Sequence, residues 1–322
     1  MKYTFCTHFD INYIAHARSL YDSLENNGLP FTLFMFCMCD ESYNLLEEVN
    51  YSNARLVHFS ELEEFIPELL FAKTNRSKVE YFYTCSPATC YYVLSNFNEI
   101  NLVTYLDADL YFFSSPEPIF KEIGNSSIGI IEHKFGWLTK RNIIYGRFNV
   151  GWISFKRDNE GMKCLKDWLD DCIDWCYQKL EGNKYADQKY LDQWPIKYNN
   201  ICIIEHKGAN LAVWNISNYR IHKENKEIYV DEDILIFYHF ANLKQIDSFL
   251  FKTDLSRVFK KTSGIIKTDI YIPYIRKLLS NKNARDKIHA KKDAHISGVY
   301  SLVVTMTRII RDKIFPDLIE FK

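Results

Sequence analysis

Strand patterns and helix patterns alternate through the first part of the chain, and this alternation restricts the fold more than any other feature. The apolar runs 3–8, 31–39 and 54–59 are expected to be buried strands, and the segments 14–24 and 43–49 have apolar residues at helical spacing. Strands joined by helices form a mostly parallel sheet with helices on its faces. Such sheets bind ligands at the carboxyl ends of their strands. The sequence therefore predicts an α/β fold with a site at that edge.

The same pattern continues to about residue 247. Further strands are expected over 102–106, 127–132, 148–155 and 234–240, and further helices over 86–95 and 162–180. Beyond that point the pattern changes to basic helical segments at 270–279 and 298–314. We therefore predict two parts, an α/β domain over residues 1–247 and a basic helical region over residues 248–322.

The C-terminal part carries an excess of positive charge. From Lys252 onward the chain has 16 Lys and Arg residues against 7 Asp and Glu residues, whereas acidic residues exceed basic ones in the preceding part. A basic segment binds an acidic partner or an anionic membrane surface, or it forms a solvated helical face. We expect the amphipathic segment 298–314 to dock on the first domain, with peripheral membrane contact as the alternative. We expect no nucleic-acid partner.

The cysteines indicate a reducing environment. The nine cysteines include no Cys-x-x-Cys pair and no zinc-ligand spacing, and several lie inside apolar runs such as 34–39. They are therefore expected to be small buried side chains. The N-terminus enters a strand pattern without a cleavable signal, and no apolar run reaches the roughly 20 residues of a membrane span. These features predict a cytoplasmic protein.

Two carboxylates follow the apolar strand that ends at Leu106. Asp107 and Asp109 are one residue apart and lie between two strongly hydrophobic segments. Two such side chains can bind one hard divalent cation, and oxygen ligands suit Mg²⁺ or Mn²⁺. The alternative is a solvated turn that closes the strand, because Asp favours turns. The apolar flanks favour the metal site, since a buried charge needs a partner or a metal.

Other polar residues also follow or interrupt predicted strands. Asp10 and Asp40 fall at strand ends, and Arg76 lies in the basic segment 73–78, which suits either a diphosphate or a solvated surface. Asn149 and Gly151 interrupt an apolar strand, which indicates either a close approach of the backbone to a ligand or a bulge.

Two further segments complete the set of candidates. Asp187 and Gln188 lie next to aromatic residues, a combination that suits the apolar faces and hydroxyl edges of a sugar. A capped surface helix is the alternative. His239 follows an apolar strand and is a candidate metal ligand or base, with a structural histidine as the alternative.

Together these stretches resemble the GT-A glycosyltransferases that use nucleotide sugars, in particular the family with bacterial lipooligosaccharide galactosyltransferases and glycogenin. The resemblance covers roughly residues 3 to 245. Its motifs are the nucleotide loop at 10–13, the metal and diphosphate motif at 107–109, the Asn-x-Gly strand at 148–151, the Asp-Gln pair at 187–188 and the His-aromatic segment at 239–244. The stretch 206–215 also resembles a group of uncharacterised bacterial proteins.

The resemblance implies a set of site residues. Mn²⁺ or Mg²⁺ would be bound by Asp107, Asp109 and His239, with His206 as the alternative third ligand. Asp187 and Gln188 would lie beside the reacting carbon. The residues expected to contact the nucleotide sugar are Thr7, Asp10, Asn12, Asp40, Arg76, Asn149 and Lys244. Trp214 and Asn215 would border the acceptor.

The implied activity is transfer of a sugar from a nucleotide-diphosphate donor, UDP-linked, to a glycan acceptor. The resemblance further implies retention of configuration, a role in bacterial cell-surface polysaccharide synthesis, and a place in the cytoplasm at the inner face of the membrane. The chain departs from the family at Asn242, where Gly is usual, at Lys189, where Asp is usual, and after Lys244, where Pro-Trp is absent.

Two other classes of protein remain as alternatives. A sugar-nucleotide nucleotidyltransferase also places metal carboxylates on an α/β sheet, but it usually has a glycine-rich loop after the first strand, and the segment 6–13 contains no glycine. The other class is a GT-A protein that binds nucleotide or carbohydrate without catalysis. Metal dependence of nucleotide binding would distinguish it from an active enzyme.

Overall fold

A seven-stranded sheet forms the centre of the molecule. The computed structural model describes residues 2–258, 264–282 and 317–320, and its sheet has the strand order β3-β2-β1-β4-β7-β6-β8. The strands are β1 (Tyr3–Phe9), β2 (Phe31–Cys37), β3 (Ala54–His58), β4 (Leu102–Leu106), β6 (Ile128–Glu132), β7 (Phe148–Lys156) and β8 (Ile201–Ile204). Only β7 runs against its neighbours, β4 and β6, within this sheet. The predicted mostly parallel α/β fold is confirmed.

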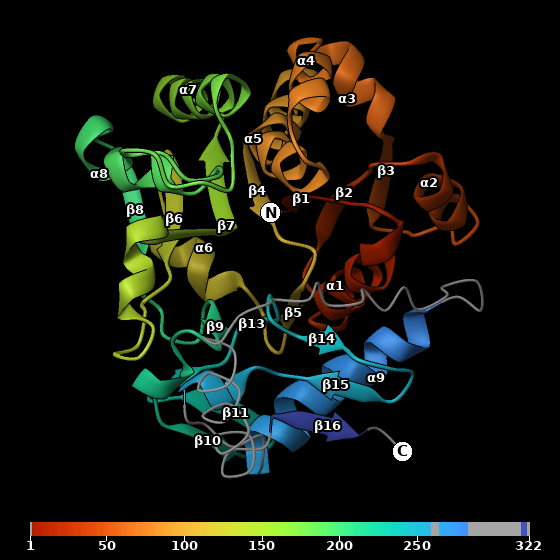
Figure 1. Cartoon of the computed structure of the whole chain (residues 1–322), viewed down its shortest axis with the longest axis vertical. Coiled ribbons are helices and arrows are strands. Elements are labelled where there is room, and N and C mark those ends of the chain that lie inside the picture. The colour runs from red at the N-terminus through yellow and green to blue at the C-terminus, as the bar shows by residue number, and fades with distance from the viewer. Residues whose placement is uncertain (1, 259–263, 283–316, 321–322) are drawn as a thin grey trace, which may run out of the picture.

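Helices cover both faces of this sheet. Figure 1 shows the strands in sheet order from β8 on the left to β3 on the right, with α5 and α7 above them and α1 and α6 below. The helices are α1 (Ile14–Asn26), α2 (Asp40–Glu47), α3 (Phe59–Phe65), α4 (Glu68–Asn75), α5 (Lys78–Asn96), α6 (Glu117–Ile123), α7 (Asn159–Asp174) and α8 (Trp194–Lys197).

The alternation of side chains along β1 and β2 divides the core into two clusters. Cys6 and Phe34 pack with α5 and α7, whereas Phe5 and Leu33 pack with α1 and α6. Successive side chains of a strand point to opposite faces, so each strand contributes to both clusters. This double burial explains why the strands appear in the sequence as continuous apolar runs.

Helix α5 is longer than the sequence indicated. It begins at Lys78, not near residue 86, because the Ser77 side chain accepts a hydrogen bond from the Glu80 backbone and the Glu80 carboxylate accepts one from the Ser77 backbone. This reciprocal capping fixes the helix start. Helix α7 begins at Asn159 behind the capping residue Asp158 and ends at Asp174, before the predicted end at residue 180.

Three small sheets lie beyond the carboxyl edge of the central sheet. They contain β5 (Leu110–Phe112) with β13 (Phe237–His239) and β9 (Leu211–Ala212), β10 (Ile221–Glu224) with β11 (Glu227–Val230) and β12 (Asp233–Ile234), and β14 (Lys244–Gln245) with β15 (Leu250–Lys252) and β16 (Leu318–Glu320). Short 3-10 helices occupy Ile11–Tyr13, Lys140–Tyr145, Lys189–Gln193, Ile216–Asn218 and Leu255–Val258. The first of these sheets connects the Asp-x-Asp segment to His239.

The described part of the C-terminal region contains strands as well as helices. A π-helical segment (Ile266–Tyr271) leads into α9 (Ile272–Asn281), which covers most of the predicted helix 270–279. Tyr274 Oη lies 2.7 Å from His16 Nδ1 of α1, and its ring stacks on Phe240 at 3.8 Å. Side chains before and after residue 247 thus share one hydrophobic cluster. The division at residue 247 stays a prediction, and the predicted helix 298–314 lies outside the described residues.

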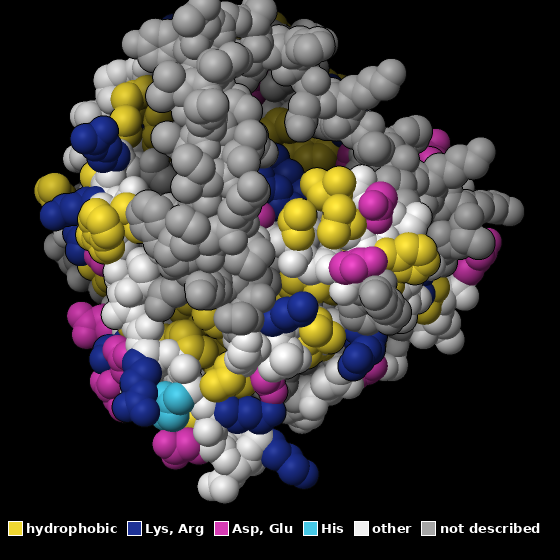
Figure 2. All heavy atoms as spheres, turned by 60° about the horizontal axis from the view of Figure 1, so that its bottom comes forward, with side chains coloured by type: hydrophobic (Ala, Val, Ile, Leu, Met, Phe, Trp, Pro, Cys, Tyr) yellow, Lys and Arg dark blue, Asp and Glu magenta, His cyan; other side chains and the backbone are white. Residues whose placement is uncertain are grey.

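Charges of both signs alternate on the face that contains this region. In Figure 2 the described Lys and Arg side chains are interspersed with Asp and Glu side chains. Lys223 pairs with Asp269, and Lys252 lies 2.9 Å from Asp254. The C-terminal region is thus tied by ion pairs both to itself and to residues of the preceding part. Among the described residues, no helix is long and apolar enough to cross a membrane.

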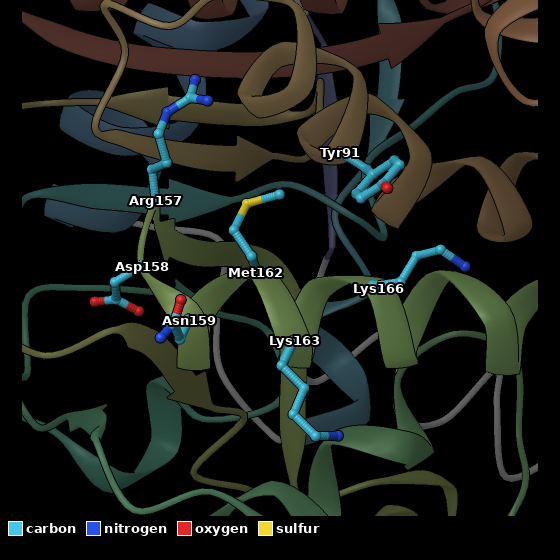
Figure 3. Close-up of a pocket in the computed structure, with 7 residues that line it drawn as sticks. All are labelled: Tyr91, Arg157, Asp158, Asn159, Met162, Lys163 and Lys166. Carbon is cyan, nitrogen blue, oxygen red and sulfur yellow. The ribbon is translucent and has the colours of Figure 1, made fainter.

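A groove of about 430 Å³ lies at the opposite edge of the sheet from these small sheets (Figure 3). It is lined by Tyr91, Arg157, Asp158, Asn159, Met162, Lys163 and Lys166. Arg157 and Asp158 directly follow the end of β7, which pairs with the beginning of β4 through Lys156 and Leu102. The groove is therefore remote from the strand end that carries Asp107.

Candidate active site

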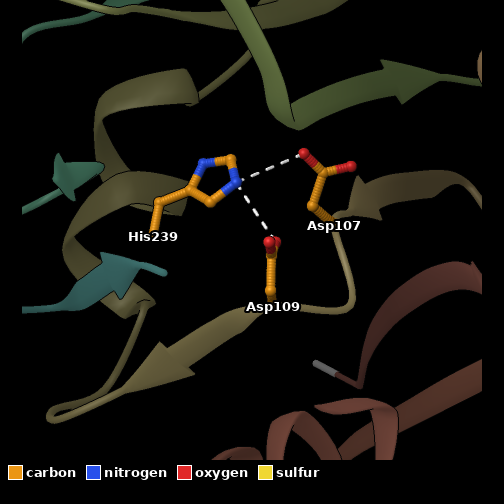
Figure 4. A group of neighbouring side chains, drawn as sticks. All are labelled: Asp107, Asp109 and His239. Atoms are coloured by element: carbon orange, nitrogen blue, oxygen red, sulfur yellow. Dashed lines mark ion pairs between the residues drawn. The ribbon is translucent and has the colours of Figure 1, made fainter. Parts of the chain in front are cut away.

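Asp107, Asp109 and His239 meet at the carboxyl end of β4. The chain turns at Asp107, whose carbonyl accepts a hydrogen bond from Leu110 N, and returns as β5. Strand β13 pairs with β5 so that His239 lies opposite Leu110. Its Nε2 is then 3.2 Å from Asp109 Oδ1 and 3.5 Å from Asp107 Oδ2 (Figure 4). The sequence-distant histidine is thus placed by two short strands.

These three side chains suit a divalent cation. One ligand atom of each residue lies within 4.8 Å of the other two. Two carboxylates and one imidazole form a mixed oxygen and nitrogen set, which Mn²⁺ accepts more readily than Ca²⁺ does. Among the described residues, this is the one cluster of at least three potential metal ligands. Of the two histidines considered as third ligand, the structure brings His239 to the aspartates.

The pKa of each of Asp107, Asp109 and His239 is shifted by at least one of the other two residues. Burial raises the pKa of Asp107 to about 6, with His239 acting against this shift and Asp109 adding to it. Burial also acts to raise the pKa of Asp109, but the charge and hydrogen bond of His239 hold it below its usual value. Burial acts to lower the pKa of His239, and the two carboxylates raise it above its usual value. Negative charge is therefore concentrated here and attracts a cation.

Asn149 orients the imidazole of His239. Its Oδ1 accepts a hydrogen bond from His239 Nδ1 at 3.2 Å, which leaves Nε2 directed at the aspartates. The amide of Asn149 is in turn fixed by His133, whose Nε2 accepts from Asn149 Nδ2 at 3.2 Å while its Nδ1 donates to the Arg147 carbonyl. Burial lowers the pKa of His133 to about 3, so this ring is neutral. Such a chain fixes the tautomer of a metal ligand.

Gly151 makes room for the same imidazole. A Cβ atom at this position would lie 2.6 Å from Asn149 Oδ1 and 2.8 Å from His239 Nδ1, closer than real side chains allow. The pairing of β6 with β7 also shifts between Ile130 and Ile131, so the bulge considered as an alternative is present. In this structure the group that closely approaches the backbone at Gly151 is therefore the His239 side chain.

Trp214 and Asn215 support the site from the side. The Trp214 ring lies edge-on to His239 at 5.1 Å and to His133 at 5.3 Å. The Asn215 side chain accepts from Ala212 N and donates to the carbonyls of His133 and Asn210. Both residues are buried, and Asn215 holds backbone segments together. Their predicted role at the acceptor stays untested.

The loop after β1 brings a lysine to Asp10. Asp10 accepts hydrogen bonds from the Asn12 backbone and side chain, both at 2.9 Å, and lies 2.5 Å from Lys78 Nζ at the start of α5. Burial raises the pKa of Tyr13 in this loop, with Asp109, Asp107 and Asp10 adding to the shift. The loop therefore borders the metal cluster. Thr7 of β1, which was also predicted to contact the nucleotide sugar, is fully buried.

Asp187 lies near Asp107 in a buried position. Its Oδ2 accepts a hydrogen bond from Ser86 Oγ at 2.8 Å, and burial raises its pKa to about 7, with the charge of Asp107 adding to the shift. Tyr105 Oη donates to Asp107 Oδ1 at 3.0 Å. Gln188 is partly exposed, and its Nε2 donates to the Tyr145 carbonyl at 2.9 Å. The Asp-Gln pair thus separates into a buried acid and an accessible amide.

Other predicted residues have partners elsewhere. Arg76 donates to Thr84 Oγ1 and to the Ile173 carbonyl, between α5 and the end of α7. Asp40 is largely exposed and lies 2.9 Å from His58 Nε2.

The two remaining candidate site residues are His206, which precedes β9 in the sequence, and Lys244, which follows it. His206 Nδ1 accepts from Gly208 N and lies 4.0 Å from Asp233. Lys244 is exposed on β14, opposite Lys252 of β15.

Ser86, Tyr105 and His133 were not identified from the sequence as site residues. Ser86 begins the predicted helix 86–95 and lies mid-helix in α5, Tyr105 is one aromatic residue of an apolar strand, and His133 has no ligand spacing to another histidine. Lys78 had a weak signal, because it belongs to the basic segment 73–78 that suited a diphosphate. Each acquires its place through tertiary contacts with Asp187, Asp107, Asn149 or Asp10.

Two curated proteins resemble the chain over most of its length. The uncharacterised protein YfnD of Bacillus subtilis (strain 168) is 32% identical over 262 residues, which are 80% of this chain and 82% of YfnD. The uncharacterised protein YfnF of the same strain is 30% identical over 252 residues, 76% of this chain and 82% of YfnF. No protein-family model matches the chain.

A solved structure supports the fold assignment. The crystal structure of the galactosyltransferase LgtC in complex with donor and acceptor sugar analogues superposes with a TM-score of 0.51 and covers 88% of this chain and 98% of that one. The two sequences are 13% identical, so the similarity concerns the fold. The GT-A fold expected from the sequence is confirmed.

Proposed function

The chain belongs to the family of the Bacillus subtilis proteins YfnD and YfnF, and because it builds an Asp-Asp-His cluster on a GT-A fold, we propose that it is a metal-dependent glycosyltransferase. The donor would be a nucleotide-diphosphate sugar, UDP-linked, and the acceptor a glycan. The observation that carries the proposal is the cluster of Asp107, Asp109 and His239 at the carboxyl end of β4. This is the edge at which α/β sheets bind nucleotides and phosphates.

Asp107, Asp109 and His239 would hold Mn²⁺ or Mg²⁺. A divalent cation at this place supplies positive charge that offsets the donor diphosphate and the negative charge of the leaving group. Asn149 and Gly151 support the metal site, since they set the tautomer and position of His239. His133 fixes Asn149 and thereby acts on the same imidazole. The residues that surround the cluster are thus built to present His239 Nε2.

Residues of the first loop and of α5 would bind the nucleotide. Asp10 and Asn12 offer hydrogen-bonding groups beside the cluster, and Thr7 lies in the strand that leads to them. Lys78 at the start of α5 would neutralise part of the diphosphate charge once its contact with Asp10 is exchanged for the ligand. Lys244, Arg76 and Asp40 stay proposals from the resemblance, and they would require other side-chain positions to reach the same ligand.

Asp187 and Gln188 would line the donor sugar. Gln188 presents its partly exposed amide, which is anchored through Nε2 to Tyr145. Asp187 has a pKa of about 7, so it can hold or release a proton near neutral pH. Ser86 donates to one oxygen of this acid and restricts its rotation. We extend the proposal to retention of configuration and to bacterial cell-surface polysaccharide synthesis, which the resemblance and the bacterial relatives support.

A panel of nucleotide sugars tests the proposal. The purified chain is incubated with each donor, Mn²⁺ and a mixed glycan acceptor pool, and released nucleoside diphosphate is measured. A glycosyltransferase releases nucleoside diphosphate from at least one donor, and Asp107→Asn abolishes the release. A nucleotidyltransferase would instead release pyrophosphate from a nucleoside triphosphate and a sugar phosphate. That outcome, or donor turnover that persists in Asp107→Asn, would overturn the proposal.

A further inference from the structure

The segment between β6 and β7 exposes several large apolar side chains. Trp137 is 76% exposed, Ile143 and Ile144 are each 48% exposed, and Tyr145 is 37% exposed. These four residues lie within nine positions of the chain. In Figure 1 the segment, drawn in yellow-green, lies at the left side of the molecule below β6 and β8. Soluble surfaces seldom gather such side chains without a binding partner.

Positive charge accompanies this apolar group. Lys140 and Arg141 are exposed between Trp137 and Ile143, and the sequence contains no Asp or Glu from His133 to Arg157. The apolar surface on α3 and α4 differs in this respect, because Phe71 is 70% exposed there but belongs to a segment with Glu63, Glu64 and Glu68. The segment 137–145 therefore combines apolar and cationic groups without acidic neighbours in the sequence.

The segment is held in place at both ends. Gly136 N and Thr139 Oγ1 donate to the Trp214 carbonyl at 2.8 and 2.6 Å. At the other end, the Tyr145 carbonyl accepts from Gln188, and the Tyr145 ring lies 4.7 Å from that of Tyr185. The exposed side chains thus project from an anchored backbone, which lowers the entropy lost when they bind a surface.

We propose that residues 137–145 dock the protein on an anionic lipid surface. Tryptophan prefers the interface between headgroups and acyl chains, and the two isoleucines add apolar area that a bilayer can cover. Lys140 and Arg141 stand beside these side chains and attract anionic headgroups, each worth about a fivefold gain in binding. The combination suits a membrane surface of negative charge better than a neutral polar partner.

This docking would place the candidate active site beside the bilayer. One anchor of the segment is Gln188 and the other is Trp214, whose ring packs against His239. A sugar acceptor carried on a lipid would then lie within reach of the metal cluster. This consequence rests on the proposed function, whereas the lipid contact itself does not.

Vesicle sedimentation of the full chain tests the proposal. The protein is expected to bind vesicles of equal parts phosphatidylglycerol and phosphatidylcholine. The triple variant Trp137→Ala, Ile143→Ser, Ile144→Ser is expected to bind them at least about tenfold more weakly. Phe71→Ala is the matched control, because it removes an exposed aromatic side chain from an acidic segment, and it should bind as the wild type does. Mn²⁺-dependent UDP binding by the triple variant shows whether the candidate active site is intact. This measurement tests the proposed function independently of the lipid contact.

Charge and insertion give two further readouts. The double variant Lys140→Gln, Arg141→Gln should lose roughly tenfold or more in binding to the anionic vesicles, and pure phosphatidylcholine vesicles should bind the wild type weakly. The emission of Trp137 should shift to the blue on binding, and the Trp137→Phe variant should bind without most of that shift. The proposal is overturned if the wild type does not bind anionic vesicles, as expected when the segment binds a soluble acceptor. It is also overturned if the triple variant binds them as tightly as the wild type, as expected when the basic C-terminal region binds the membrane.

Discussion

The two edges of the central sheet both carry charged side chains, but they balance the charge differently. At the amino-end edge of β4, Arg157 donates to the carbonyls of Ile100 and Phe97 beside the groove of Figure 3. At the carboxyl edge, Asp107 and Asp109 face one histidine. The Arg157 guanidinium beside the groove is thus already bound by the protein itself.

The other charges of the groove are also paired within the fold. Asp158 accepts from Gly161 N as the cap of α7 and from Ser127 Oγ, and Lys163 lies 2.7 Å from Asp167. Lys166 pairs with Asp170 one turn along the helix. These contacts stabilise the helix start and its exposed face.

The contrast shows which property marks the candidate site. Asp107 is half-buried and its pKa is raised to about 6, because burial and a second carboxylate oppose its ionisation. A fold keeps such an arrangement at a cost in stability, and active sites are where this cost is common. A partly buried carboxylate beside a second carboxylate distinguishes the carboxyl edge from the groove.

The largest expected effect is the loss of a metal ligand. Asp109→Asn removes one carboxylate charge but keeps the shape of the side chain, so donor turnover should fall on the order of 100-fold or more. Asp158→Asn at the opposite edge is the matched control, because Asn also caps helices well and the change should leave turnover within about twofold. Turnover is measured as nucleoside diphosphate released in Mn²⁺. Equal losses of donor turnover in the two variants would contradict a specific role of the carboxyl edge.

Adding one methyl group at Gly151 should weaken the metal site next. Gly151→Ala places a Cβ against Asn149 Oδ1 and His239 Nδ1, so either side chain must move. We expect Mn²⁺ affinity to fall about 10- to 100-fold and stability to fall by about 1–3 kcal/mol. Calorimetric Mn²⁺ titration and thermal unfolding measure the two effects. Gly182→Ala, at a glycine with φ of 56° and open space around it, should lower stability without changing Mn²⁺ affinity.

Removing the partner of His239 Nδ1 should have a smaller effect. Asn149→Leu keeps the size of the side chain but cannot accept the imidazole proton, so His239 loses its fixed tautomer. Mn²⁺ affinity should fall by roughly tenfold. The same titration measures it, and an unchanged affinity would mean that Trp214 and Gly151 alone hold the ring.

Asp187 should make stability depend on pH. Its folded-state pKa of about 7 lies above the ordinary value of 3.8, so the folded state binds the proton more tightly than the unfolded state does. The resulting stabilisation is complete below about pH 4 and is lost as pH rises through 7. Asp187→Asn does not titrate, so its stability relative to the wild type should rise by roughly 3–4 kcal/mol between pH 4 and 8. Urea unfolding in chelator at both pH values measures this, and a pH-independent difference would exclude the raised pKa.

The smallest effect is expected in the groove. Lys163→Gln with Lys166→Gln removes two exposed ion pairs on α7, which should change stability by less than about 1 kcal/mol and leave donor turnover unchanged. Urea unfolding and nucleoside diphosphate release are the measurements. A marked loss of turnover would show that the groove contributes to function.

The sequence predicted the central strands and the candidate metal ligands, because each candidate ligand stands at the end of an apolar run. The strands around 3–8, 31–39 and 102–106 appear as apolar runs, and Asp107 and His239 each come at the end of such a run. Asp107 stands at the carboxyl end of a central strand, where α/β sheets bind ligands, so a site at this edge was accessible without coordinates. The approach of His239 to it depends on the antiparallel pairing of β13 with β5 in a separate small sheet.

Side-chain partners across long sequence separations were not predictable in this way. The capping of α5 at Ser77 directs Lys78 to Asp10 but Arg76 to Thr84, and composition alone does not distinguish the two cations. Likewise, Asn149 was expected at the donor sugar, which stays a prediction, but the contacts of its amide with two histidines were not expected. The sequence indicated a bulge as one alternative at Asn149 and Gly151, but it did not identify His133 and His239 as the partners of the amide.

The most direct test of the account is calorimetry of UDP binding with Mn²⁺ and with a chelator. If Asp107, Asp109 and His239 bind a cation that bridges the diphosphate, UDP should bind with a Kd between about 1 μM and 1 mM in Mn²⁺ and at least about tenfold more weakly in chelator. Asp109→Asn should bind UDP weakly under both conditions. Equal affinity in Mn²⁺ and chelator, or an Asp109→Asn variant that binds as the wild type does, would contradict the metal site on which the proposed function depends.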